Sequence, residues 1–237
     1  MKNNEELSSG VIEHLEELRK RIFFVLAGWV ILSIAGYAFS REILHFLIQP
    51  LAKFQEKPVF MRPVEPFTAI IKISILAGGV LNLPNILYQT WAFLVPALTG
   101  KEKRMFGLIF CAFPLFFAAG AAFSIYVIVP FGLRVLFSFA GENMKPFIGI
   151  GSYLNFVLGF MGALGLVFNL PVILVGIASA GMIDSGFLKR KRRYAILFAF
   201  ILAAVLTPPD VLTQILVAIP LVILYEISII LAKIFHK

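Results

Sequence analysis

Long apolar segments separated by short charged loops make up most of this chain. The segments cover residues 22–39, 67–94, 106–129, 153–180, 194–206 and 211–232. An α-helix needs about 20 apolar residues to cross the hydrocarbon of a bilayer, and five of the six segments have about that length or more. The pattern predicts an all-α polytopic membrane protein with six transmembrane helices, formed as one integral membrane domain over residues 1–237.

The segment 194–206 is the exception, because only about 13 apolar residues precede a turn at Thr207, Pro208, Pro209 and Asp210. We interpret it with the segment 211–232 as a helical hairpin that is shorter than the membrane is thick. A short span is accommodated by local thinning of the bilayer or by packing against longer neighbours.

Prolines predict interruptions in several helices. Pro84 lies inside the second apolar segment between Asn82 and Asn85, and we expect a bend there. Pro50 closes a short apolar stretch in the polar connector 40–65, so a short helix should end before it. Residues 131–150 are predicted to be a mixed connector.

The distribution of lysine and arginine predicts the orientation, because cytoplasmic loops are enriched in these residues. With six spans, fourteen cations lie on the side of the two termini and seven on the other side. Both termini are therefore expected in the cytoplasm.

Composition narrows the possible functions further. The chain is 60% hydrophobic and only 14% charged, whereas soluble domains are about one-quarter charged. The net charge of +8 does not indicate nucleic-acid binding, since the cations cluster at the ends of apolar segments. Cys111 is the only cysteine, so no internal disulfide can form, and the three histidines lie too far apart in sequence to suggest a metal site.

Catalysis is not indicated, because the spans contain serines but no histidine that could act as their base. An ion-coupled small-solute transporter is the alternative function, since such carriers keep ionisable groups within the membrane. Glu226 is the only carboxylate within a predicted span. It is either a carboxylate bonded to a neighbouring helix or a proton relay, and the sequence leaves both interpretations open.

Residues 13–21 combine three carboxylates and three permanent cations directly before the first span. A membrane anchor would need only the cations. The pairs Glu16/Lys20 and Glu17/Arg21 have the i,i+4 spacing that stabilises a helix, so a charged juxtamembrane helix explains the segment without any ligand. The excess of acid leaves a binding function open.

Four motifs in the same order resemble the TatC family, the six-span receptor subunit of the twin-arginine protein export system. The first motif consists of His14, Leu15, Glu17, Leu18, Arg19 and Arg21. The second includes Tyr88, Gln89, Trp91, Phe93, Pro96, Glu102, Lys103 and Arg104. The third and fourth contain Thr207, Pro208, Pro209, Asp210 and Gln214, followed by Pro220, Tyr225 and Glu226.

The resemblance implies that the protein binds folded cargo proteins through signal peptides with paired arginines. By position, Glu17 and Glu102 match the acids that contact the signal, and Phe93 matches the neighbouring aromatic residue. Carboxylates suit this role because a guanidinium pairs with them through two hydrogen bonds. The resemblance also implies single-span partners of the TatA and TatB type, an oligomeric complex in the bacterial inner membrane, the proton gradient as energy source, and no cofactor.

The fourth span departs from the family pattern. Many members carry a glutamate shortly before the proline, at the position where this chain has Asn169, two residues before Pro171. An asparagine can still hydrogen-bond across helices, but it cannot carry charge. We group Asn169, Gln214 and Glu226 as intramembrane polar residues for contact with partner helices, and Pro50, Pro84, Pro208 and Asp210 as structural residues.

Overall fold

The computed structural model describes residues 2–54, 56–94, 100–139, 146–179, 181, 183–207 and 210–235. Its helices are α1 (Lys2–Ala38), α2 (Ser40–Ala52), α3 (Glu65–Leu81), α4 (Leu83–Leu94), α5 (Gly100–Phe123), α6 (Val129–Ser138), α7 (Ile150–Val167), α8 (Leu170–Ser179), α9 (Ser185–Leu206) and α10 (Val211–Phe235). A π-helical turn, Ser124–Ile128, joins α5 to α6. The protein is all-α, as predicted.

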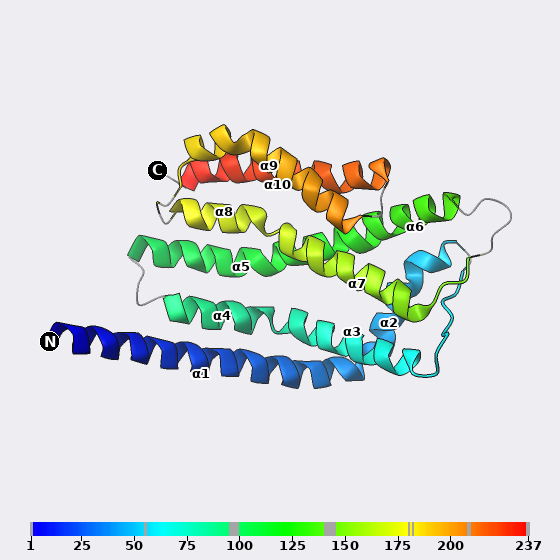
Figure 1. Cartoon of the computed structure of the whole chain (residues 1–237), viewed down its shortest axis with the longest axis horizontal. Coiled ribbons are helices and arrows are strands. Elements are labelled where there is room, and N and C mark those ends of the chain that lie inside the picture. Colours follow the sequence, from blue (N-terminus) through cyan, green and yellow to red (C-terminus); the bar gives the residue numbers. More distant parts are fainter. Residues whose placement is uncertain are drawn as a thin grey trace.

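The helices form six passes that run alternately along the long axis of the molecule (Figure 1). The passes are α1, α3–α4, α5–α6, α7–α8, α9 and α10. Four of them contain a stretch long and apolar enough to cross a membrane, and α3–α4 adds a fifth when its bent halves count as one span. Among the described helices α9 does not qualify, because five consecutive cations occupy its first half.

The start of α1 and the end of α10 lie at the same end of the bundle, together with the start of α5, the end of α8 and the start of α9 (Figure 1). The opposite end holds α2 and the outer part of α6. The outer ends of α9 and α10 lie short of the outer end of α6 (Figure 1), and a hairpin shorter than the membrane is thick stays a prediction.

Apolar side chains pack into two main clusters along the bundle. One, around Leu51, Ile73 and Leu154, joins α2 and α3 to α6 and α7. The other, around Leu164 and Val217, joins α7 to α9 and α10. In contrast, α1 packs chiefly along α3 and α4 at the edge of the bundle (Figure 1).

Glycine allows α1 to approach its neighbours closely. A Cβ atom at Gly78 of α3 would lie 2.5 Å from the backbone nitrogen of Ser33 in α1. A Cβ atom at Gly28 of α1 would lie 2.7 Å from the amide groups of both Asn82 and Asn85. Small residues at such crossings are typical of helix packing in membranes.

The predicted bend at Pro84 is confirmed, since α3 and α4 meet at an angle of 44°. The prediction for Pro50 is wrong, because α2 continues through it to Ala52. The φ angle of proline suits a helix, and only one backbone hydrogen bond is lost. Pro50 and Leu51 are both buried, and this burial offsets the lost bond.

Two other boundaries also differ from the prediction. Residues 129–138, placed mostly in a connector, form α6, because the π-helical turn carries the helix past Pro130 and buries Leu133. Helix α9 begins at Ser185 rather than Tyr194, since Asp184 caps it by accepting a 2.6 Å hydrogen bond from the Phe187 backbone nitrogen. The cations 189–193 are therefore helical.

Candidate functional site

The first part of the candidate site is an ion pair on α1. Glu17 and Arg21 lie one helical turn apart, and the Arg21 Nε atom donates to Glu17 Oε1 at 3.0 Å. A second guanidinium nitrogen of Arg21 donates to the same oxygen. The Glu17 side chain remains 37% exposed, whereas that of Arg21 is only 22% exposed. Arg21 is thus the inner member of the pair and Glu17 the accessible one.

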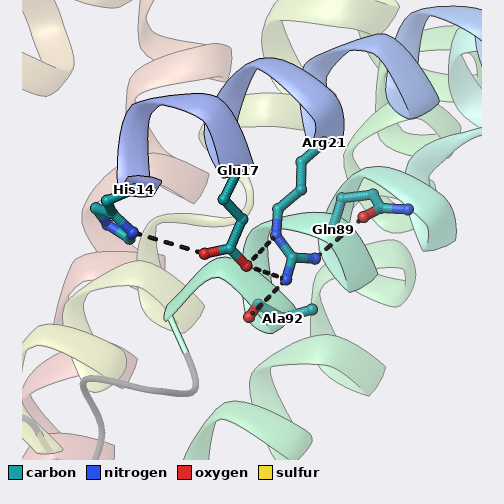
Figure 2. A network of polar contacts seen from close by, with 5 residues as sticks. All are labelled: His14, Glu17, Arg21, Gln89 and Ala92. Carbon is teal, nitrogen blue, oxygen red and sulfur yellow. Dashed lines mark hydrogen bonds and ion pairs between the residues drawn. The ribbon is translucent and has the colours of Figure 1, made fainter. Parts of the chain in front are cut away.

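Arg21 also connects α1 to the end of α4, as Figure 2 shows. Its remaining N–H groups donate to Gln89 Oε1 at 3.3 Å and to the Ala92 carbonyl oxygen at 3.1 Å. The planar guanidinium offers donors in fixed directions, so one side chain holds Glu17 and two groups of α4 together.

A row of amides continues this connection towards the bend in α3–α4. Gln89 donates to Asn85 Oδ1 at 3.5 Å, and Asn85 donates to Asn82 Oδ1 at 3.0 Å. Asn82, which is fully buried, donates to the Val25 carbonyl oxygen of α1 at 3.0 Å. The row faces α1 at Gly28, where the absence of a side chain leaves space for the amide groups.

Phe93 is the second part of the site and is brought to α1 by the end of α4. The ring of His14 stacks on it with 4.1 Å between centroids and 12° between planes. The Nδ1 atom of the same imidazole lies 3.6 Å from Glu17 Oε2 (Figure 2). Glu17 and Phe93, on different helices, therefore meet at one place through His14.

The site opens to the surrounding medium. A pocket of about 360 Å³ is lined by Glu17, Lys20, Arg21, Phe24, Tyr88 and Gln89. A neighbouring open depression of about 710 Å³ is lined by Glu16, Glu17, Arg19, Lys20, Phe23 and Phe24. Its two carboxylates can attract a cationic group, and its two aromatic rings can contact an apolar segment.

Not every predicted residue joins this site. Glu102 lies in the first turn of α5, but its side chain, like residues 95–99, is outside the described part of the structure. Leu15, Leu18 and Arg19 are exposed on α1. The Glu16/Lys20 pair is not among the ion pairs of the described residues, while Glu17/Arg21 is formed.

The predicted intramembrane polar residues make contacts within the chain. Asn169 is fully buried at the break between α7 and α8 and donates to the Gly165 carbonyl oxygen at 2.8 Å. Its Oδ1 atom has no hydrogen-bond partner among the described residues. Gln214 ties α10 to α9 by donating to the Phe200 carbonyl oxygen at 3.1 Å.

Glu226 forms a bidentate ion pair with Arg192 of α9, with both N–O distances at 2.7 Å. Along the bundle, Glu226 therefore lies at the same depth as the cations in the first half of α9. Asp210 caps α10 by accepting a 2.6 Å hydrogen bond from the Thr213 backbone nitrogen. Pro208 lies outside the described residues.

The role of Arg21 as a bridge to Gln89, and of Asn85 as the next amide in the row, was not predicted from the sequence. A signal was present, because Asn82, Asn85 and Gln89 have the i, i+3, i+7 spacing of one helix face. Three amides in a row on an otherwise apolar helix require partners on another helix.

Comparisons with known proteins agree with this architecture. The family described as Sec-independent protein translocase protein (TatC) matches residues 13–220. The chain is 41% identical to the Sec-independent protein translocase protein TatC of Carboxydothermus hydrogenoformans over 224 residues, which cover 94% of this chain and 92% of that protein. It is 37% identical to the protein of the same name from Desulforapulum autotrophicum, over 99% of this chain and 88% of the relative.

A solved structure is also similar over nearly the whole length. The crystal structure of a twin arginine translocase receptor, TatC, superposes with a TM-score of 0.80 at 36% sequence identity. The match covers 94% of this chain and all of the solved one.

Proposed function

Because this chain belongs to the TatC family of Sec-independent protein translocase proteins, we propose that it binds twin-arginine signal peptides of folded proteins for export. The observation that carries the proposal is the carboxylate of Glu17, which is held by Arg21, remains accessible, and is linked to Phe93 through the ring of His14. A visiting guanidinium pairs well with a carboxylate and stacks on an aromatic ring. One signal arginine is assigned to Glu17 and the second to Glu102.

The pocket beside Glu17 supports the choice of a signal peptide as ligand. Such a ligand carries an apolar segment, and Phe23 and Phe24 line the same depression as Glu16 and Glu17. A signal can therefore place its arginines at the membrane surface and its apolar part along α1. Binding is thus assigned to the end of the bundle that holds the start of α1 and the end of α10 (Figure 1).

The chain is an integral membrane protein and a subunit of the translocase. We place it in the bacterial cytoplasmic membrane with both termini in the cytoplasm, since fourteen of its lysines and arginines lie on that side. Single-span subunits of the TatA and TatB type are the proposed partners in an oligomeric complex. The proton gradient is the proposed energy source, and the protein is proposed to act without an enzymatic step.

The transporter alternative loses its main support. A proton relay requires a carboxylate that exchanges protons within the membrane, whereas Glu226 is held by the guanidinium of Arg192. Proteoliposomes that contain the chain should show no small-solute uptake sensitive to Glu226→Gln.

Crosslinking of a signal peptide tests the proposed site. A photoreactive group next to the paired arginines should crosslink to the wild-type protein, and Glu17→Ala and Glu102→Ala should each weaken the crosslink while the protein still inserts. Glu42→Ala is the matched control, because Glu42 is an exposed carboxylate of α2, which lies at the opposite end of the bundle. Unchanged crosslinking in both test variants would refute the assignment.

A further inference from the structure

His14 occupies the space between the two groups that we assign to signal recognition. Its ring lies flat against Phe93, at 4.1 Å and 12°, and its edge faces Glu17 Oε2 at 3.6 Å. The side chain is 56% exposed. It is therefore held by two neighbours and can leave towards solvent.

The two oxygens of Glu17 differ in how firmly they are engaged. Arg21 donates two hydrogen bonds to Oε1. The separation of 3.6 Å between Oε2 and His14 Nδ1 is too long for a normal hydrogen bond. Among the described side chains, Oε2 is thus the weakly engaged oxygen of the anchored carboxylate.

The pose of His14 matches what a guanidinium would adopt there. Both groups are planar, present N–H donors at their edge, and stack on aromatic rings. A guanidinium would bind Glu17 more strongly than the imidazole does, because its charge is permanent and its donors form a fork. It would also stack more strongly on Phe93, because cations are attracted to the face of an aromatic ring.

We propose that the His14 ring occupies the position that one arginine of the signal peptide takes on binding. Phe93 and Glu17 Oε2 form this guanidinium subsite, and the bound arginine displaces the His14 ring from it. Arg21 stays on Oε1 as a positioning residue. The inference rests on the proposed function and adds to it the place of one arginine and a group that competes for that place.

The proposal predicts opposite effects for two substitutions at one position. His14→Ala removes the competitor, so a synthetic twin-arginine peptide should bind about three- to tenfold more tightly to the purified protein in nanodiscs, as expected for the loss of one aromatic stack. His14→Arg supplies a permanent internal guanidinium and should weaken binding. Ile12→Ala, an exposed position on the same helix, should leave the affinity unchanged.

Weaker or unchanged binding by His14→Ala would overturn the proposal while leaving the proposed function intact. That function is tested in the same experiment by Glu17→Gln and by a twin-lysine peptide, both of which should bind poorly. If neither differs from the reference, the proposed function itself fails.

A measurement on the wild-type chain avoids any folding defect of the variants. The chain has three histidines, and isotope-labelled histidine gives one set of ring resonances for each. Addition of the twin-arginine peptide should move the His14 signals as its ring leaves Phe93. Unmoved His14 signals at saturating peptide would overturn the proposal.

Discussion

Replacement of Arg21 by lysine should separate the two halves of the candidate site without removing charge. The guanidinium reaches Glu17, Gln89 and Ala92 in three directions. Lysine carries its donors on a single nitrogen, so it cannot keep all three contacts. We expect the bonds to Gln89 and to the Ala92 carbonyl oxygen to be lost.

The magnitude follows from those two bonds. A hydrogen bond contributes about 0.5–1.5 kcal/mol net, so the contact between α1 and the end of α4 should weaken by roughly 1–3 kcal/mol. We assign no free energy to the ion pair with Glu17, because that carboxylate is accessible to water. If the contact keeps Glu17 beside Phe93, signal affinity should fall by about fivefold or more.

Spin labels at Glu16 and Thr90, in a variant with Cys111 replaced, measure the distance between α1 and α4 in nanodiscs. Arg21→Lys should broaden the distance distribution and weaken peptide binding. Arg41→Lys is the matched control, because Arg41 is exposed on α2 at the opposite end of the bundle, and it should change neither. A wild-type distribution and affinity for Arg21→Lys would refute the role of Arg21 as a bridge.

Two further predictions concern the bundle. Gly78→Ala should lower the thermal stability of the purified protein, because its Cβ atom would lie 2.5 Å from the Ser33 nitrogen. Gly159→Ala is the control and should not lower the stability, because the Cβ position there has open space. Equal melting temperatures of the two variants would contradict the packing of α1 on α3. Arg192→Gln should lower the melting temperature by breaking the pair with Glu226. In a double-mutant cycle, the double variant with Glu226→Gln should recover part of this loss. Purely additive effects of the two substitutions would show that the pair contributes no coupling energy.

The apolar pattern was sufficient to predict the helical class, most of the passes and the bend at Pro84. These features depend on the local sequence, since a membrane helix must satisfy its own backbone hydrogen bonds. Local sequence misplaced the end of α2, because burial of Pro50 and Leu51 decides whether the helix continues. It also misplaced the start of α9, where cations that argue against a span are compatible with a helix at the membrane surface.

The candidate site was only partly predictable for a similar reason. The i,i+4 spacing predicted the pair of Glu17 and Arg21, which is local. The contact of Arg21 with Gln89 and the stack of His14 on Phe93 depend on which face of α4 meets α1. That choice is fixed by tertiary packing at Gly28 and Gly78.

We propose that this chain distinguishes paired arginines from other cations at Glu17. Crosslinking of two signal peptides that differ only in twin arginine or twin lysine, to the wild-type protein and to Glu17→Gln, tests this claim most directly. We predict a strong crosslink only for the twin-arginine peptide with the wild-type protein. Equal crosslinking of both peptides to both proteins would contradict the account.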